Sequence, residues 1–247
     1  MSGGRFTRHR RHVAAATVAG TVAAGAGIGG WLFVAEAGTR ADADRWLVVA
    51  GAVFAAVVGF AAYHLDDPDD ALAPPNLVTA SRGGLYAATA GFLAVPPSTP
   101  AVAWAPAACY GTGVALDLVD GHLARRLGRT TALGARLDLA FDTLGFLVAP
   151  LVGVVWGRLP VAYLSISAAK YAYRAGIGWR RRRGRPIGDL PESRLRRPLA
   201  ALQMGFITVA LAPVLPVSVV HPVSLVVVAP SLVVFGRDYL AVTGRWG

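Results

Sequence analysis

Charged residues are scarce in this chain of 247 residues. They make up 15% of it, whereas 55% of the residues are hydrophobic and the mean hydropathy is +0.51. A soluble domain carries about a quarter charged residues, and a disordered chain is far less hydrophobic. The single cysteine, Cys109, cannot pair within the chain, which excludes a disulfide-stapled secreted scaffold. A polytopic helical membrane protein is the class that remains.

Lysine is also nearly absent. Lys170 is the only one, so the net charge of +10 comes almost entirely from arginine, and the pI is near 10.8. Such a charge can indicate nucleic-acid binding, but here no pattern of interleaved aromatic and basic residues and no known fold signature accompanies it. The arginines instead stand in short segments between apolar blocks, as the positive-inside rule describes. We therefore expect contact with anionic lipid headgroups and no nucleic-acid partner.

Eight apolar blocks follow one another, and their lengths approach the roughly 20 residues of a membrane span. Each block predicts a helix: 13–34, 45–63, 77–95, 101–118, 137–156, 161–178, 199–215 and 217–235. The predicted fold class is therefore all-α, a polytopic membrane protein. A cleavable signal is the alternative for the first block, because Ala35-Glu36-Ala37 resembles an A-x-A cleavage site. However, the apolar run is longer than the usual signal core of about 7–15 residues.

The distribution of arginine orients these helices. With the N-terminus in the cytoplasm, the arginine-poor connecting segments fall outside: 36–44, 96–100, 156–160 and 213–222. The cytoplasm then receives the remaining polar segments: 5–12, 64–75, 120–136, 179–198 and 237–247. We expect a multi-pass protein of the cell membrane whose polar segment 120–136 faces the cytoplasm.

Four aspartates stand at helical spacing near the middle of the chain. One helix face carries two of them with small residues and an arginine, at i, i+3, i+4, i+7 and i+8: Asp117, Asp120, Gly121, Ala124 and Arg125. A second face carries a glycine and the other two aspartates, at i, i+4 and i+8: Gly134, Asp138 and Asp142. A short turn containing Gly128 separates the two stretches, so we expect adjacent, antiparallel helices.

Clustered carboxylates in a membrane require a compensating cation. Each aspartate costs about 2.5–3.5 kcal/mol near the bilayer centre and less toward the interface, and four carboxylates facing one another repel. A divalent metal removes both problems. Ligands that are all carboxylate oxygens suit Mg²⁺ or Mn²⁺, and the lack of a Cys/His cluster argues against zinc. Interfacial salt bridges without a metal are the plainer alternative.

The complete pattern of these residues, DxxDGxxAR-x8-GxxxDxxxD from Asp117 to Asp142, resembles the signature of the CDP-alcohol phosphatidyltransferases at every fixed position. Segment 75–82, which reads PNLVTASR, is similar to the opening of the first core helix of that family. The resemblance covers residues 75 to about 244. It implies a six-helix transmembrane core within residues 71–247, preceded by a two-span extension in residues 1–70, and a homodimer.

The resemblance also implies a reaction. Members of the family transfer a phosphatidyl group from a CDP-linked lipid to an alcohol and release CMP. Carried over to this chain, two divalent ions, Mg²⁺ or Mn²⁺, would be held by Asp117, Asp120, Asp138 and Asp142. Asp142 would also take the proton from the acceptor hydroxyl. The residues that would line the CDP site are Asn76, Thr79, Gly121, Ala124, Arg125, Thr131 and Gly134.

Several alternatives stay open at this point. Asn76 and Thr131 could serve only as helix caps. The arginine-rich segment 179–198 slightly favours a phosphorylated acceptor, although it could serve only topology and lipid attraction. The motif does not distinguish diacyl from ether-linked donors. A non-catalytic membrane or transport protein that keeps an acidic cation site is the alternative function, and metal-dependent release of CMP separates the two.

Overall fold

The computed structural model describes residues 25–65, 74–127 and 132–244. Within these ranges the regular structure is helical and no strand occurs, as the all-α prediction requires. The chain divides into two compact units, one ending at Val152 and the other beginning at Gly153, and each is described by itself.

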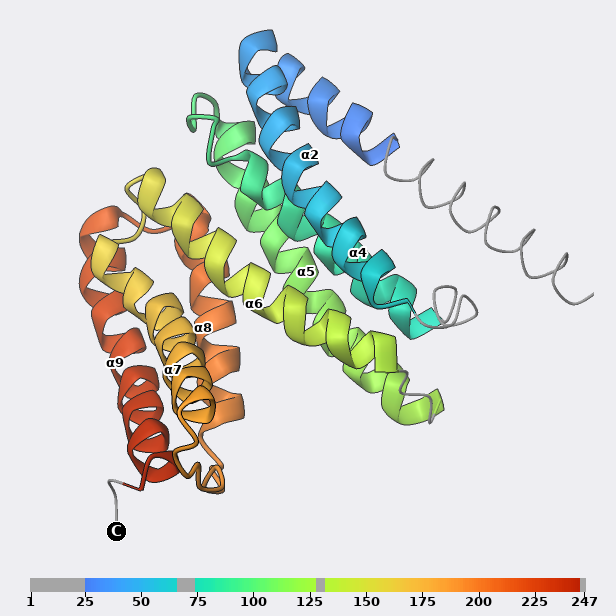
Figure 1. The fold of residues 1–247 in the computed structure, drawn as a ribbon. Coiled ribbons are helices and arrows are strands. Elements are labelled where there is room, and N and C mark those ends of the chain that lie inside the picture. The colour runs from blue at the N-terminus through green and yellow to red at the C-terminus, as the bar shows by residue number, and fades with distance from the viewer. Residues whose placement is uncertain (1–24, 66–73, 128–131, 245–247) are drawn as a thin grey trace, which may run out of the picture. The chain divides into compact units, whose positions relative to one another are not determined.

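Helices occupy every predicted block within the described residues (Figure 1). The first unit contains helical residues 25–37 and α2 (Arg40–Tyr63), α4 (Pro74–Gly91), α5 (Pro100–Leu127) and most of α6 (Ala132–Val155). The second contains the short 3₁₀-helix η1 (Val161–Leu164), α7 (Ser165–Arg182), α8 (Arg196–Leu211) and α9 (Val217–Val242). Residues 13–24 of the first predicted block lie outside the described residues.

Several helix ends differ from the predicted boundaries. Helix α5 continues past residue 118 to Leu127, because the polar motif residues of this stretch are part of the helix. Helix α4 ends at Gly91, before the predicted residue 95. The sixth block begins as a 3₁₀ turn, and α7 proper starts at Ser165. Hydrophobicity locates a membrane helix but does not mark where hydrogen bonding stops.

Three of the described helices are long and apolar enough to cross a membrane: Arg40–Tyr63, Leu133–Val155 and Val217–Val242. The other described helices fall short in length or are more polar. For example, α8 has only 16 residues, and α4 carries Arg82 at its middle. The structure therefore supports a membrane protein, whereas eight spans and a six-helix core with an added N-terminal pair stay predictions.

Helix α4 packs against both α5 and α2 in the first unit. Its residue Tyr86 is 1% exposed and lies between a glycine of α5 and a glycine of α6. A Cβ atom at Gly113 would lie 2.6 Å from Tyr86 Cε1, and one at Gly145 would lie 3.0 Å from Cε2. Glycine at both positions therefore allows the two helices to close around the tyrosine ring.

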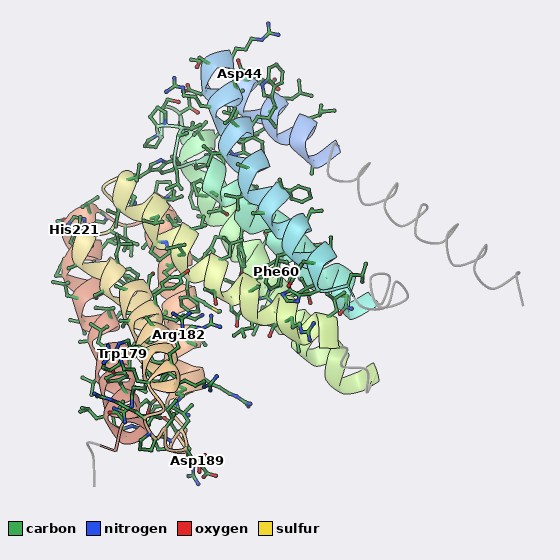
Figure 2. The ribbon with its side chains drawn as sticks, in the orientation of Figure 1. Asp44, Phe60, Trp179, Arg182, Asp189 and His221 are labelled. Atoms are coloured by element: carbon green, nitrogen blue, oxygen red, sulfur yellow. The ribbon has the colours of Figure 1, made fainter. Side chains whose placement is uncertain are left out.

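Helix α2 is an integral part of the first unit, although it precedes the segment that carries the family resemblance. The Trp46 indole Nε1 of α2 donates a 3.0 Å hydrogen bond to the Ala88 carbonyl of α4. A Cβ atom at Gly91 would lie 2.4 Å from Trp46 Cδ1, so the ring fits closely against the end of α4. Nearer its C-terminal end, α2 contributes Phe60 (labelled in Figure 2) to an apolar groove that it shares with Phe141 of α6.

Contacts at the two ends of the first unit agree with the predicted alternation of its helices. At one end, Thr99 Oγ1 donates a 2.7 Å hydrogen bond to the Ala37 carbonyl, which joins two segments predicted to lie outside. At the other end, Arg136 Nη1 lies 3.5 Å from His64 Nδ1, which joins two segments predicted to lie inside.

The second unit shows the same agreement. Arg158 Nη2 donates a 3.0 Å hydrogen bond to the Leu215 carbonyl, between two predicted outer segments. Arg180 Nη2 donates to the Thr243 carbonyl at 3.2 Å, between α7 and the end of α9. Buried Gln203 links α8 to η1 and α9, because it accepts a hydrogen bond from the Tyr163 hydroxyl of η1 and donates one of 3.0 Å to Ser231 Oγ of α9.

Candidate active site

Three of the four motif aspartates come together in the first unit. Asp117 stands on α5, and Asp138 and Asp142 stand one helical turn apart on α6. One carboxylate oxygen of each lies within 4.8 Å of the corresponding oxygens of the other two. The side chains of this three-carboxylate cluster are 30%, 50% and 33% exposed, in chain order. The cluster is therefore open to a ligand while its carboxylates remain partly shielded from water.

A buried arginine of α4 bridges the three carboxylates. Arg82 has an exposed fraction of 0%. Its Nη1 atom lies 2.7 Å from Asp117 Oδ1 and 2.6 Å from Asp138 Oδ1, and its Nη2 atom lies 2.7 Å from Asp142 Oδ1. One guanidinium thus ties α4 to both α5 and α6. Its single positive charge faces three negative ones, so the four groups together remain anionic.

The aspartate pattern did not predict Arg82 as a site residue. A signal was nevertheless present, because Arg82 is the only charged residue in the predicted block 77–95. A lone ionisable residue within an apolar membrane helix marks a functional site by default. In addition, the Arg82 Nε atom is buried and has no hydrogen-bond partner among the described residues. An unpaired buried donor of this kind costs about 1–3 kcal/mol, and the buried Nε of Arg180 in the second unit is unpaired in the same way.

Close packing fixes the turn of α4 that carries Arg82. A Cβ atom at the following residue, Gly83, would lie 2.8 Å from Phe141 Cζ and 2.9 Å from Val57 Cγ1. The backbone of α4 is therefore pressed between α2 and α6 at the height of the carboxylates. A small residue next to Arg82 is what permits this approach.

Two predicted CDP contacts share the buried face of α4 with Arg82. Asn76 and Thr79 are both buried and precede Arg82 at intervals of three residues. Gly134 of α6 lies one turn before Asp138. The side chains of four other predicted residues are outside what the structure describes: Asp120, Gly121, Ala124 and Arg125. Thr131 and the Gly128 turn lie outside the described residues altogether, so the predictions about them stay predictions.

The donor set of the cluster fits a hard divalent cation. It consists of three carboxylates, without histidine or cysteine, and such oxygen ligands suit Mg²⁺ or Mn²⁺. Two oxygens bound to one Mg²⁺ lie at most about 4.2 Å apart, twice the metal–oxygen distance. Small side-chain rotations would therefore bring the three oxygens onto one ion.

The fold and the site together define a helical membrane protein with an acidic cation-binding cluster formed between its helices. A sequence model of the family described as CDP-alcohol phosphatidyltransferase matches residues 72–234, which is more than half of the chain. The chain therefore belongs to the CDP-alcohol phosphatidyltransferase family, as its aspartate motif predicts. No curated protein and no solved structure matches the chain. The matched range contains the three-carboxylate cluster and Arg82, whereas α2 precedes it.

Membership gives the site a general chemistry. The family consists of transferases that use a CDP-alcohol donor and an alcohol acceptor, and it depends generally on divalent cations. Carboxylates from two helices, held within reach of one ion, are the arrangement that such a dependence requires.

Proposed function

We propose that this protein is a membrane-embedded enzyme of phospholipid synthesis. It transfers a phosphatidyl-type group, with diacyl or ether-linked chains, from a CDP-linked lipid to an alcohol and releases CMP. The observation that carries the proposal is the three-carboxylate cluster, in which aspartates of the family motif meet from α5 and α6.

The motif aspartates have two roles in this proposal. Asp117, Asp120, Asp138 and Asp142 hold two divalent ions, Mg²⁺ or Mn²⁺. When bound, such an ion pair stabilises negative charge on the attacking and leaving oxygens of the phosphoryl transfer. Asp142 is also the general base, which needs only hydrogen-bond reach of the acceptor hydroxyl.

The transfer forms one bond and breaks another. The acceptor oxygen attacks the β-phosphorus, and its proton passes to the Asp142 carboxylate. The bond from that phosphorus to the bridging oxygen breaks, and CMP leaves with the electron pair. Arg125 adds charge-assisted hydrogen bonds to the phosphates.

The nucleotide end of the donor occupies the face that precedes Arg82 on α4. Buried Asn76 and Thr79 offer side-chain hydrogen-bonding groups there. The motif residues from the α5 and α6 side that complete the CDP site are Gly121, Ala124, Arg125, Thr131 and Gly134.

The acceptor in this proposal carries a phosphate, as in a phosphorylated polyol, because arginine forks bind phosphate in a bidentate manner. In the second unit, Arg196 already donates hydrogen bonds to Asp238 Oδ2 at 2.7 Å and to the Pro191 carbonyl at 2.6 Å. Exposed arginines of α7, of the following loop and of the first turn of α8 are therefore better candidates for binding the phosphate: Arg174, Arg194 and Arg197.

The proposed setting is the cell membrane, with the active site facing the cytoplasm and the protein forming a homodimer. Support for the orientation comes from the arginine-rich segments, which the positive-inside rule places in the cytoplasm. The homodimer rests on the family resemblance alone.

A direct assay tests the proposed function. Membranes containing the protein are incubated with CDP-linked lipid, Mg²⁺ or Mn²⁺, and a panel of alcohols with and without phosphate. We expect metal-dependent release of CMP, and mass spectrometry of the lipid product identifies the acceptor. Asp138→Asn membranes are the matched control. If no alcohol supports release of CMP, a non-catalytic cation-binding membrane protein becomes the better description.

A further inference from the structure

We propose that Arg82 is a resident counter-cation of the metal centre, which holds the three carboxylates together when no ion is bound and weakens the binding of the divalent ion. This inference rests on the cation-binding part of the proposed function and not on the transfer reaction. It assigns a task to a residue of α4, whereas the aspartate motif lies on α5 and α6.

The contacts of Arg82 are with the atoms that a metal would use. Its two Nη atoms lie within 2.6–2.7 Å of the Oδ1 atoms of Asp117, Asp138 and Asp142. An ion that binds these oxygens directly, at about 2.0–2.1 Å for Mg²⁺, must displace the guanidinium from them. An ion that binds the other carboxylate oxygens remains a few ångströms from a positive charge. In both arrangements Arg82 opposes ion binding.

Two other arginines that are buried or partly buried, Arg180 and Arg158, are bonded differently. Arg180 donates to the carbonyls of Pro186 and Thr243, and Arg158 donates to several carbonyls that include Ala212. Those arginines tie backbone segments together. Arg82 instead directs both Nη atoms at the partly exposed carboxylates of the site. Its arrangement therefore serves the carboxylates.

A resident cation explains how the cluster can exist before an ion arrives. Three carboxylates brought within 4.8 Å of one another repel and would spread apart or take up protons. Arg82 offsets one of their three charges and fixes the position of each oxygen. Because one positive charge faces three negative ones, the cluster still attracts a divalent ion.

Mn²⁺ binding to the full-length protein in lipid nanodiscs tests this role. Electron paramagnetic resonance measures free Mn²⁺ in wild type, Arg82→Met and the control Arg158→Met, which removes an arginine outside the cluster. We expect Arg82→Met to bind Mn²⁺ at least about tenfold more tightly, since a unit charge a few ångströms away acts strongly at an effective dielectric constant of about 20. Arg158→Met should bind as wild type does. Without metal, Arg82→Met should unfold at a lower temperature, and Mn²⁺ should raise that temperature more than in wild type.

Unchanged or weaker Mn²⁺ binding in folded Arg82→Met would overturn the proposal, because Arg82 would then order the carboxylates without opposing the ion. If Arg82→Met does not fold, the same Mn²⁺ measurement is made on Arg82→Gln. The glutamine amide is neutral but can still donate hydrogen bonds to the carboxylates. The same gain in Mn²⁺ affinity is expected, and its absence overturns the proposal.

The result of the Mn²⁺-binding experiment can be distinguished from the result of the CMP-release assay that tests the proposed function. Tighter Mn²⁺ binding in the Arg82 variants supports the counter-cation even if wild type releases no CMP. Release of CMP by wild type together with unchanged Mn²⁺ affinity in the variants overturns the counter-cation alone. A wild-type protein that binds no Mn²⁺ overturns both.

Discussion

Asp142 is one-third exposed, and its Oδ1 atom lies 2.7 Å from Arg82 Nη2. A partly hydrated carboxylate beside one cation can receive a proton from an incoming hydroxyl and release it to water. Asp138 is half-exposed and bonds to the same guanidinium. The two residues stand one turn apart on α6, yet the proposed mechanism gives the task of proton transfer to Asp142 alone.

The different roles of the aspartates predict different responses to metal. Asp142→Asn should lower the transfer rate by about 10²–10⁴, the usual effect of removing a general base, and extra Mn²⁺ should not restore it. Asp117→Asn and Asp138→Asn should fail mainly through weak metal binding, so extra Mn²⁺ should partly restore them. All three should fold, because clustered carboxylates burden a membrane helix. Release of CMP at increasing Mn²⁺ concentrations measures each response.

Asp189→Asn is the control, since Asp189 is exposed in the second unit, as Figure 2 shows. It should leave turnover unchanged. Near-wild-type turnover in well-folded Asp142→Asn would contradict the proposed base, and the family relationship would then describe only the fold.

The arginines of the second unit should separate into binding and structural groups. If the acceptor carries a phosphate, changing the responsible residue among Arg174, Arg194 and Arg197 to glutamine should raise the acceptor KM far more than the KM for CDP-lipid. Arg196→Gln should instead lower thermal stability, because it removes a bond to buried Asp238. Steady-state kinetics with each substrate varied in turn measures the difference. An equal rise in both KM values would show that the arginines serve folding or lipid attraction.

At the scale of the element, α4 links α2 to the candidate active site, although α2 precedes the residues that the family model matches. Its neighbours are α2 and α5, and its residue Gly83 touches Val57 of α2 and Phe141 of α6 where Arg82 reaches the carboxylates. A residue of α2 therefore limits where α4, and with it Arg82, can lie.

Two adjacent glycines of α4 test this packing. Gly83→Ala places a Cβ atom 2.8 Å from Phe141 Cζ, and such overpacking typically costs about 1–3 kcal/mol. Gly84→Ala is the matched control, because its Cβ atom would lie 3.8 Å from the nearest side-chain atom, Phe54 Cε2. That change should be neutral or stabilise the helix by up to about 1 kcal/mol. Thermal unfolding in detergent compares the two variants, and equal stability would show that Phe141 and Val57 yield without cost.

At the scale of the whole molecule, the contacts within each unit join segments predicted to lie on the same side of the membrane. Thr99 bonds to the Ala37 carbonyl at one end of the first unit. In the second unit, the Gly188 backbone N–H donates a 2.9 Å hydrogen bond to the Val242 carbonyl. These pairs indicate which connecting segments lie on the same side of the membrane. Which of the two sides is cytoplasmic is inferred from the distribution of arginine between those segments.

Cysteine labelling in intact cells tests that choice. In a Cys109→Ser background, a cysteine at exposed Ser98 should react with a membrane-impermeant thiol reagent. A cysteine at Ser193, within the arginine-rich segment, should react only after the membrane is permeabilised, since the positive-inside rule places it in the cytoplasm. Labelling of Ser193→Cys from outside would overturn the predicted orientation.

Hydrophobic blocks and motif spacing were sufficient to predict the helices and the family. A stretch such as 217–235 forms a helix in any packing, because an apolar segment in a membrane must satisfy its own backbone hydrogen bonds. The helical spacing from Asp138 to Asp142 places both carboxylates on one face of α6 for the same local reason.

Only the tertiary structure decided that an arginine of α4 meets these aspartates across helices. Arg82 is separated from Asp117 by 35 residues and from Asp142 by 60, and no periodicity within one helix encodes such a pairing. The meeting depends on close packing around Tyr86 and Gly83, which follows from the shapes of several helices together. The ends of α4 and α5 likewise differ from the ends of the apolar blocks. Local physics therefore specified the helices and the aspartates on them, and packing between helices brought a buried arginine among those aspartates.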